Sequence, residues 1–101
     1  MQALEVMRGA TYLAPHVAKY HWNLGELLRR LGRFQEAETS IRTALTLNPG
    51  DAGTLWLLGF ISEQQGKFVD AQSHYEAALV ADPSYAQARQ SLDALRARAT
   101  I

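Results

Sequence analysis

The sequence predicts an all-α fold made of antiparallel helix pairs, and two observations lead to this prediction. Residues 18–51 align with residues 52–85 without a gap, and 10 of the 34 columns are identical. Within each of these two repeats, apolar residues recur at spacings of three and four, which is the periodicity of a helix with one buried face. A fixed period of this length is typical of stacked helix pairs. The sequence shows no alternating strand pattern.

Six helices are expected, and turn residues mark most of their ends. Pro15 ends the first helix, because proline cannot continue one. Gly32 and Gly66 follow the second and the fourth, since glycine adopts the left-handed conformation at a helix end without penalty. Asp51 is expected to cap the fourth helix, and Ser84 is expected to begin a capping box for the sixth. The expected ranges are 1–14, 18–31, 34–47, 52–65, 68–81 and 85–98.

Small residues at matching positions of the two repeats indicate how each helix pair packs. Gly25 and Ala37 are expected to face each other across the first pair, and Gly59 and Ala71 across the second. Because these residues have little or no side chain, the two helix axes can approach closely. A leucine in place of Ala71 should overfill this contact.

Composition and charge narrow the classes of partner and location. Ten basic and ten acidic side chains balance, so the chain lacks the positive field that favours nucleic acid or an anionic membrane. There is no cysteine, which excludes disulfides and thiolate metal sites. No apolar stretch reaches the ~20 residues of a spanning helix, and the N-terminus lacks a signal-peptide pattern. We therefore expect a cytoplasmic location, no nucleic-acid partner and no membrane insertion.

The repeated residues resemble the pattern of the tetratricopeptide repeat (TPR) family. That pattern has an aromatic residue, a Leu-Gly pair, a glycine turn, a second aromatic residue, two spaced alanines and a proline. The residues that match it are Trp22, Leu24, Gly25, Gly32, Phe34, Ala37, Ala44 and Pro49, and then Trp56, Leu58, Gly59, Gly66, Phe68, Ala71, Ala78 and Pro83.

The resemblance implies a right-handed superhelix of helix pairs with a concave groove. TPR units are overwhelmingly interaction modules, so it also implies a scaffold or adaptor that binds a peptide or partner segment in that groove and is not itself an enzyme. A single TPR domain over residues 1–101 is expected, with a half-repeat at 1–15, full repeats at 18–51 and 52–85, and a half-repeat or capping helix at 86–101.

The groove is expected along one side of the first helix of each pair. Trp22, Trp56 and Phe60 would form an aromatic strip at its centre with charges on its rim, as in a binding hot spot. The alternative is that these aromatic residues pack partly against the adjoining helix. The expected groove residues are Lys19, Trp22, Asn23, Glu26, Arg29, Arg30, Trp56, Phe60, Glu63, Gln64, Gln90 and Arg98.

Two binding modes known in the family are not expected here. Some TPR domains grip the C-terminal carboxylate of heat-shock chaperones with lysine, asparagine and arginine. The matching positions hold no such donor, and Glu26 would repel a carboxylate. Others hold a peptide backbone with a ladder of asparagines, but Leu57 and Ser91 interrupt the series that Asn23 would begin. Asn23 alone then favours a structural contact. The matching clamp positions are Trp22, Glu26, Leu57, Gln87 and Ser91.

No cofactor, metal or catalytic residue is expected. His16, His21 and His74 do not share the three- or four-residue spacing of a helical metal site. Arginines on the last helix (Arg89, Arg96 and Arg98) favour a solvated face over a nucleic-acid site.

Two other functions stay open from the sequence. The repeats could be the substrate-recruiting arm of a larger enzyme such as a glycosyltransferase. Alternatively, the chain could self-assemble, because residues 1–14 lack a partner helix and could expose Ala3, Met7 and Ala10 to another copy.

Overall fold

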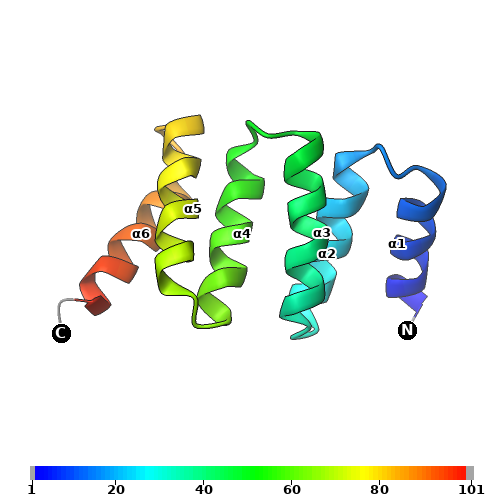
Figure 1. The fold of residues 1–101 in the computed structure, drawn as a ribbon, viewed down its shortest axis with the longest axis horizontal. Coiled ribbons are helices and arrows are strands. Elements are labelled where there is room, and N and C mark those ends of the chain that lie inside the picture. Colours follow the sequence, from blue (N-terminus) through cyan, green and yellow to red (C-terminus); the bar gives the residue numbers. More distant parts are fainter. Residues whose placement is uncertain (1, 100–101) are drawn as a thin grey trace. The chain divides into compact units, whose positions relative to one another are not determined.

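The computed structural model describes residues 2–99, and over that range the chain forms six helices and no strand (Figure 1). Each helix begins and ends within one residue of its expected range, which confirms the all-α prediction. The chain divides into two compact units, Met1–Pro49 and Gly50–Ile101, with three helices each. The helices are α1 (Gln2–Leu13), α2 (Ala18–Arg30), α3 (Phe34–Leu47), α4 (Ala52–Gln64), α5 (Phe68–Ala81) and α6 (Ala86–Ala99).

In the first unit, α2 and α3 form an antiparallel pair (Figure 1). A Cβ atom built on Gly25 would lie 2.5 Å from Ile41 Cδ1 and 3.3 Å from the carbonyl oxygen of Ala37. The absent side chain at Gly25 therefore makes room for Ile41, which is fully buried. The expected close contact between Gly25 and Ala37 is confirmed.

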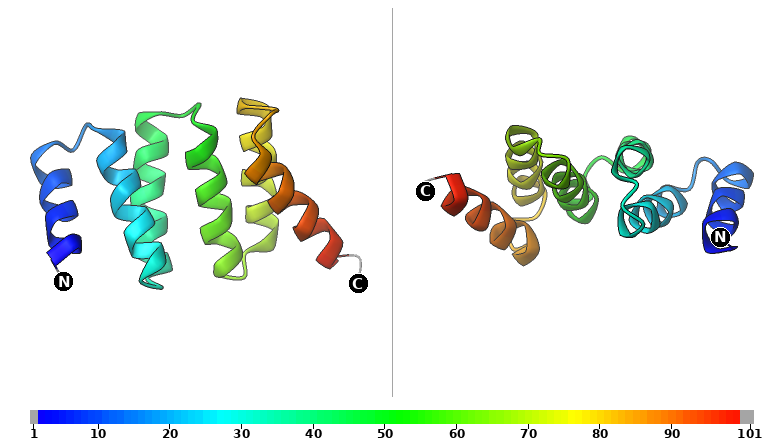
Figure 2. Two further views of the ribbon diagram at one scale, coloured as in Figure 1. Left: turned by 180° about the vertical axis from the view of Figure 1, so that it is seen from behind. Right: turned by 90° about the horizontal axis from the view of Figure 1, so that it is seen from below.

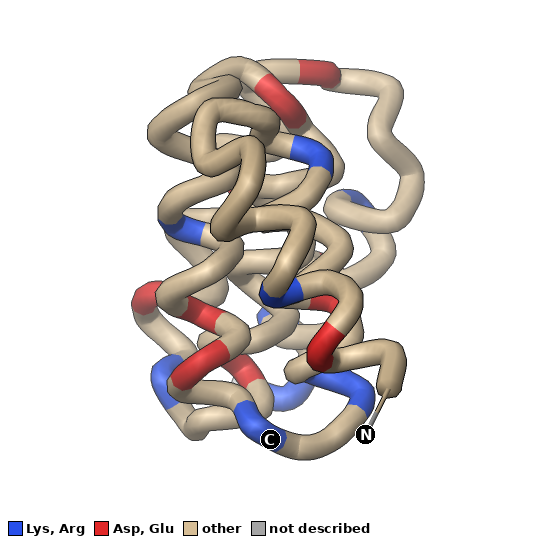
Figure 3. The backbone as a smooth tube through the Cα atoms, turned by 90° about the vertical axis from the view of Figure 1, so that its right-hand side faces the viewer, with Lys and Arg blue, Asp and Glu red and all other residues tan. Residues whose placement is uncertain are grey.

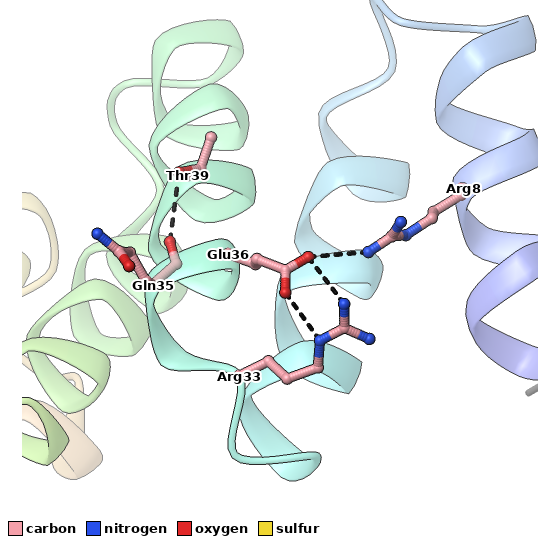
Figure 4. A network of polar contacts seen from close by, with 5 residues as sticks. All are labelled: Arg8, Arg33, Gln35, Glu36 and Thr39. Carbon is pink, nitrogen blue, oxygen red and sulfur yellow. Dashed lines mark hydrogen bonds and ion pairs between the residues drawn. The ribbon is translucent and has the colours of Figure 1, made fainter.

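Helix α1 packs against α2 and is also tied to α3 by a polar contact (Figure 4). The Arg8 guanidinium donates to the Glu36 carboxylate at 2.9 Å. Arg33 donates to the same carboxylate twice, at 2.8 and 3.1 Å. The hydrogen bond from Arg33 is the main reason why the pKa of Glu36 lies below its ordinary value. One carboxylate thus joins three parts of this unit.

The second unit repeats this pairing in α4 and α5 and adds α6 beside them (Figure 2). A Cβ on Gly59 would lie 2.6 Å from Tyr75 Cε1 and 3.3 Å from the carbonyl oxygen of Ala71. The predicted contact between Gly59 and Ala71 is thereby confirmed. One cluster in the core of this unit consists of Ala71, Tyr75, Leu92 and Leu95.

Most of the expected helix ends are confirmed. Gly32 and Gly66 have φ angles of 77° and 76°, in the left-handed region that favours glycine. The Asp51 carboxylate accepts a hydrogen bond from the backbone N–H of Thr54 at 3.0 Å and caps α4. The predicted capping box at Ser84 is wrong. Helix α6 begins at Ala86, and the Ser84 hydroxyl instead donates to Asp82 at 2.7 Å.

Acidic and basic positions are interspersed over the backbone (Figure 3). Two arginines of α6 have acidic partners. Arg96 donates to Glu76 on α5 at 3.1 Å, and Arg98 donates to Glu63 on α4 at 3.0 Å. None of the helices described for residues 2–99 is long and apolar enough to cross a membrane.

Candidate functional site

Helix α4 is buried on all sides but one. Eight of its residues are buried, among them Leu55, Leu58 and Ser62. The positions that keep solvent contact follow the helical spacing of three and four, and so they form a single stripe. They are Gly53, Trp56, Phe60, Glu63 and Gln64.

Two aromatic side chains occupy the middle of this stripe. The rings of Trp56 and Phe60 are stacked, with their centroids 5.7 Å apart and an angle of 22° between the ring planes. The Trp56 indole N–H donates to the Ser91 hydroxyl of α6 at 3.0 Å. Trp56 also packs against the core of the second unit. The alternative that the aromatic residues partly pack against the adjoining helix is therefore confirmed for Trp56, which keeps part of its surface in solvent.

A chain of hydrogen bonds lies beside the aromatic pair and joins the three helices. The buried Tyr75 hydroxyl of α5 donates to Glu63 at 2.8 Å, and Arg98 of α6 donates to the other carboxylate oxygen of Glu63 at 3.0 Å. Burial raises the pKa of Tyr75, and the hydrogen bond to the Glu63 carboxylate and its charge raise this pKa further. The Arg98 guanidinium also lies 5.3 Å from the centroid of the Phe68 ring. Glu63 is thus held from two sides.

Helix α6 follows α4 in the same direction (Figure 2). Near the start of α4, a Cβ on Gly53 would lie 3.3 Å from the Tyr85 hydroxyl, which is a tight contact. Trp56 meets Ser91 in the middle, and Glu63 meets Arg98 near the end. We call this region the α4–α6 surface and define it by Trp56, Phe60, Glu63, Ser91 and Arg98.

The predicted groove residues of the first unit lie on α2 and form a different cluster. Arg29 and Arg30 both donate to the Glu26 carboxylate, Arg30 at 2.9 Å. Burial alone would raise the pKa of Glu26, but the hydrogen bonds and charges of the two arginines outweigh it and lower the pKa. Lys19 is exposed, and Trp22 and Asn23 are half-buried. The continuation of the aromatic strip from Trp22 to Trp56 stays a prediction.

The structure places several other residues that the sequence had singled out. Leu57, at one of the clamp positions, is fully buried. Gln64 and Gln90 are exposed on α4 and α6. His21 shares a hydrogen bond with the carbonyl oxygen of Pro15 at 2.8 Å. Residues 2–99 hold no group of three or more acidic or histidine side chains that could bind a metal ion.

Sequence reasoning did not assign Ser91, Tyr75 or Tyr85 to the site. Ser91 was considered as a break in an asparagine ladder and as a carboxylate-clamp position without the required donor, whereas it accepts the Trp56 indole N–H. A usable signal was present. Ser91 lies 35 residues after Trp56, and so it directly follows Gln90, the position that matches Trp56 one period later.

The comparison with known protein families identifies one of the two full repeats. The family model named Tetratricopeptide repeat matches residues 18–51, the first of the two full repeats. No curated protein matches the chain by sequence.

Solved structures are similar over nearly the whole chain. The first TPR of Spaghetti (RPAP3) bound to the HSP90 peptide SRMEEVD has a TM-score of 0.92 and 20% identity, over 98% of this chain and 79% of that one. PcrH in complex with the chaperone binding region of PopD has a TM-score of 0.89 and 20% identity, over 96% of this chain and 78% of that one. The type III secretion translocator chaperone SycD of Yersinia enterocolitica has a TM-score of 0.93 and 14% identity, over 99% and 74%. At these identities, the likeness establishes the fold.

Proposed function

We propose that the chain is a tetratricopeptide repeat protein, as the family match over residues 18–51 supports, and that it is a protein-interaction module that binds a peptide or partner segment on the α4–α6 surface. One observation carries this proposal. The stripe of α4 that stays in solvent is centred on a stacked tryptophan and phenylalanine. An aromatic anchor surrounded by polar groups is the usual composition of a binding hot spot.

Two proteins of similar fold support a peptide as the ligand. One was solved with the HSP90 peptide SRMEEVD, and another with the chaperone binding region of PopD. This chain differs from a carboxylate clamp at the positions compared above, so its ligand is a different one. Within the second unit, Gln64 and Gln90 of the predicted groove extend the proposed site. The predicted groove residues of α2 are proposed as a separate contact region of the first unit, and they are Lys19, Trp22, Asn23, Glu26, Arg29 and Arg30.

The proposal includes a scaffold or adaptor role without catalysis or a cofactor, in the cytoplasm. The TPR fold is typically a non-catalytic interaction module. A nucleic-acid partner is not favoured, because Arg96 and Arg98 of α6 are already paired with Glu76 and Glu63.

Self-association through α1 is a second candidate, because α1 exposes apolar side chains. Val6 is 69% exposed and Leu13 82% exposed. Of the three residues expected to be exposed there, Ala3 is exposed, whereas Met7 and Ala10 are half-buried. Sedimentation equilibrium over a wide concentration range tests this role. A mass that rises toward a dimer, and that stays monomeric in a Val6→Ser/Leu13→Ser variant, supports it, whereas a monomeric mass throughout contradicts it.

The peptide-binding role is tested by selecting ligands for the wild-type chain from a phage library of random dodecapeptides. Selected peptides are synthesised, and their Kd values are measured by fluorescence anisotropy. Loss of a hot-spot aromatic side chain should cost ~2 kcal/mol or more, so Trp56→Ala should weaken binding more than tenfold. Val80→Ala on α5, which truncates a side chain that is 84% exposed, is the control and should leave the Kd unchanged. Equal binding by wild type and Trp56→Ala would contradict the assignment.

A further inference from the structure

The two charged side chains of the α4–α6 surface neutralise each other. Arg98 donates to Glu63 at 3.0 Å, and Glu63 also accepts the Tyr75 hydroxyl at 2.8 Å. The Glu63 side chain is only 20% exposed. The Arg98 guanidinium is further engaged by the Phe68 ring. This pair therefore offers no uncompensated charge to an incoming ligand.

Several other charges of the second unit are engaged elsewhere or lie on another side of α6. The Asp51 carboxylate caps the N-terminus of α4, where it accepts a hydrogen bond from the backbone N–H of Thr54. Arg96 pairs with Glu76 of α5. Arg96 shares a helical stripe with Arg89 and Asp93, because the three are spaced by four and three residues, whereas the contacts with α4 come from Ser91 and Arg98.

What the surface offers is apolar area and neutral amides. Trp56 and Phe60 are stacked, and the Trp56 N–H is already bonded to Ser91, so the indole presents carbon atoms to a ligand. Gln64, on the exposed stripe of α4, and Gln90 of α6 carry amides. An amide can both donate to and accept from the backbone of a peptide.

We propose that the α4–α6 surface recognises a protein segment with an uncharged, apolar anchor side chain, without selecting for acidic or basic residues. This inference rests on the proposed function and specifies its ligand. Charged side chains of a ligand that are buried against Trp56 and Phe60 would lose their water without gaining a partner of opposite charge, which is unfavourable. Apolar side chains instead gain by covering Trp56 and Phe60.

The test is the residue composition of the peptides that are selected from the dodecapeptide library. Wild type should enrich apolar residues, while the frequencies of Asp, Glu, Lys and Arg stay at or below those of the unselected library. The Kd of a selected peptide should change less than about twofold between about 50 and 500 mM NaCl, since no ligand charge is involved. Fluorescein-labelled SRMEEVD is the charged probe and should not bind.

Two variants, each of which removes one charge of the Glu63–Arg98 ion pair, make this test specific to that pair. Glu63→Gln keeps an oxygen for the Tyr75 hydroxyl but releases the charge of Arg98, so selection should shift toward acidic peptides. Arg98→Gln leaves Glu63 uncompensated and should shift selection toward basic ones. Glu76→Gln is the matched control: it removes the partner of Arg96 outside the surface and should shift nothing. Far-UV circular dichroism verifies that each variant is folded.

The outcomes separate this inference from the function on which it rests. If no peptide is enriched on wild type over Trp56→Ala, the binding function itself fails. If peptides are enriched but are consistently acidic or basic, or if neither Glu63→Gln nor Arg98→Gln changes their charge, the function stands and the inference is overturned.

Discussion

The two full repeats solve the same packing problem with different side chains. Where Gly25 gives space to Ile41, the matching Gly59 gives space to Tyr75. Ile41 ends in a methyl group, whereas the longer Tyr75 reaches Glu63 with its hydroxyl. The glycine column, which is the pair of matching positions Gly25 and Gly59, therefore sets how closely the two helices of each repeat approach. The residue opposite it decides whether the pair also carries a polar contact at the α4–α6 surface.

A second pair of matching positions also differs in polarity, this time in the interior. Leu28 of the first repeat is replaced by Ser62 in the second, and both are almost fully buried. Within the described part of the chain, the Ser62 hydroxyl has no hydrogen-bond partner. The second repeat thus has a polar network at its surface and an unsatisfied hydroxyl in its interior, while the first repeat is apolar at both columns.

The largest difference in stability is expected when Leu28 and the matching Ser62 are each replaced by alanine. Leu28→Ala leaves a cavity and should lower the free energy of unfolding by about 2–5 kcal/mol. Ser62→Ala removes a buried hydroxyl without a partner and should raise it by up to about 1 kcal/mol. Urea unfolding followed by circular dichroism measures both. A similar loss in the two variants would show that the columns do not differ as described.

The glycine column should give a smaller, graded effect. A Cβ at Gly59 meets the rigid ring of the fully buried Tyr75, so Gly59→Ala should cost about 2 kcal/mol through overpacking. A Cβ at Gly25 would lie 2.5 Å from Cδ1 and 2.6 Å from Cγ1 of Ile41. This smaller, aliphatic side chain carries no hydrogen bond that fixes it, so a change of rotamer can relieve part of the overlap. Gly25→Ala should then cost about 1 kcal/mol less than Gly59→Ala. Thermal unfolding of the two variants decides the comparison, and an equal loss in both would contradict it.

The smallest effect on stability is expected from loss of the Glu26 charge. The matching position in the second repeat is the uncharged Phe60. The pKa of Glu26 is lowered in the folded chain. Its ion pairs therefore contribute stability above the unfolded pKa, and this contribution is lost as the pH falls through the folded pKa. The contribution should not exceed about 1 kcal/mol, because such pairs are screened.

This pH dependence is measured as the difference in unfolding free energy between wild type and Glu26→Gln. The difference should favour wild type at neutral pH and shrink as the pH falls through the folded pKa of Glu26. A difference that grows on acidification would reverse the sign of the argument.

The sequence predicted the parts of the fold that depend on local chemistry and on the period. The helix ranges, the two left-handed glycines and the cap at Asp51 follow from neighbouring residues, and the contacts at Gly25 and Gly59 follow from the repeat. Ser84 was assigned wrongly because Asp82 competes for its hydroxyl.

The candidate site was only partly predictable. Trp56, Phe60, Glu63 and Arg98 were named from helical spacing. Their interactions with one another depend on side-chain rotamers and on contacts across 35 residues, which spacing alone does not determine.

The most direct test of the central claim is a titration of the ¹⁵N-labelled chain with a selected peptide, followed by NMR. The indole N–H signal of Trp56 and the backbone amides of Phe60 and Gln90 should shift in proportion to the bound fraction. The amides of Val69 and Val80, on the exposed side of α5, should not move. Shifts confined to α5 or α1, with an unchanged Trp56 signal, would contradict a binding role for the α4–α6 surface.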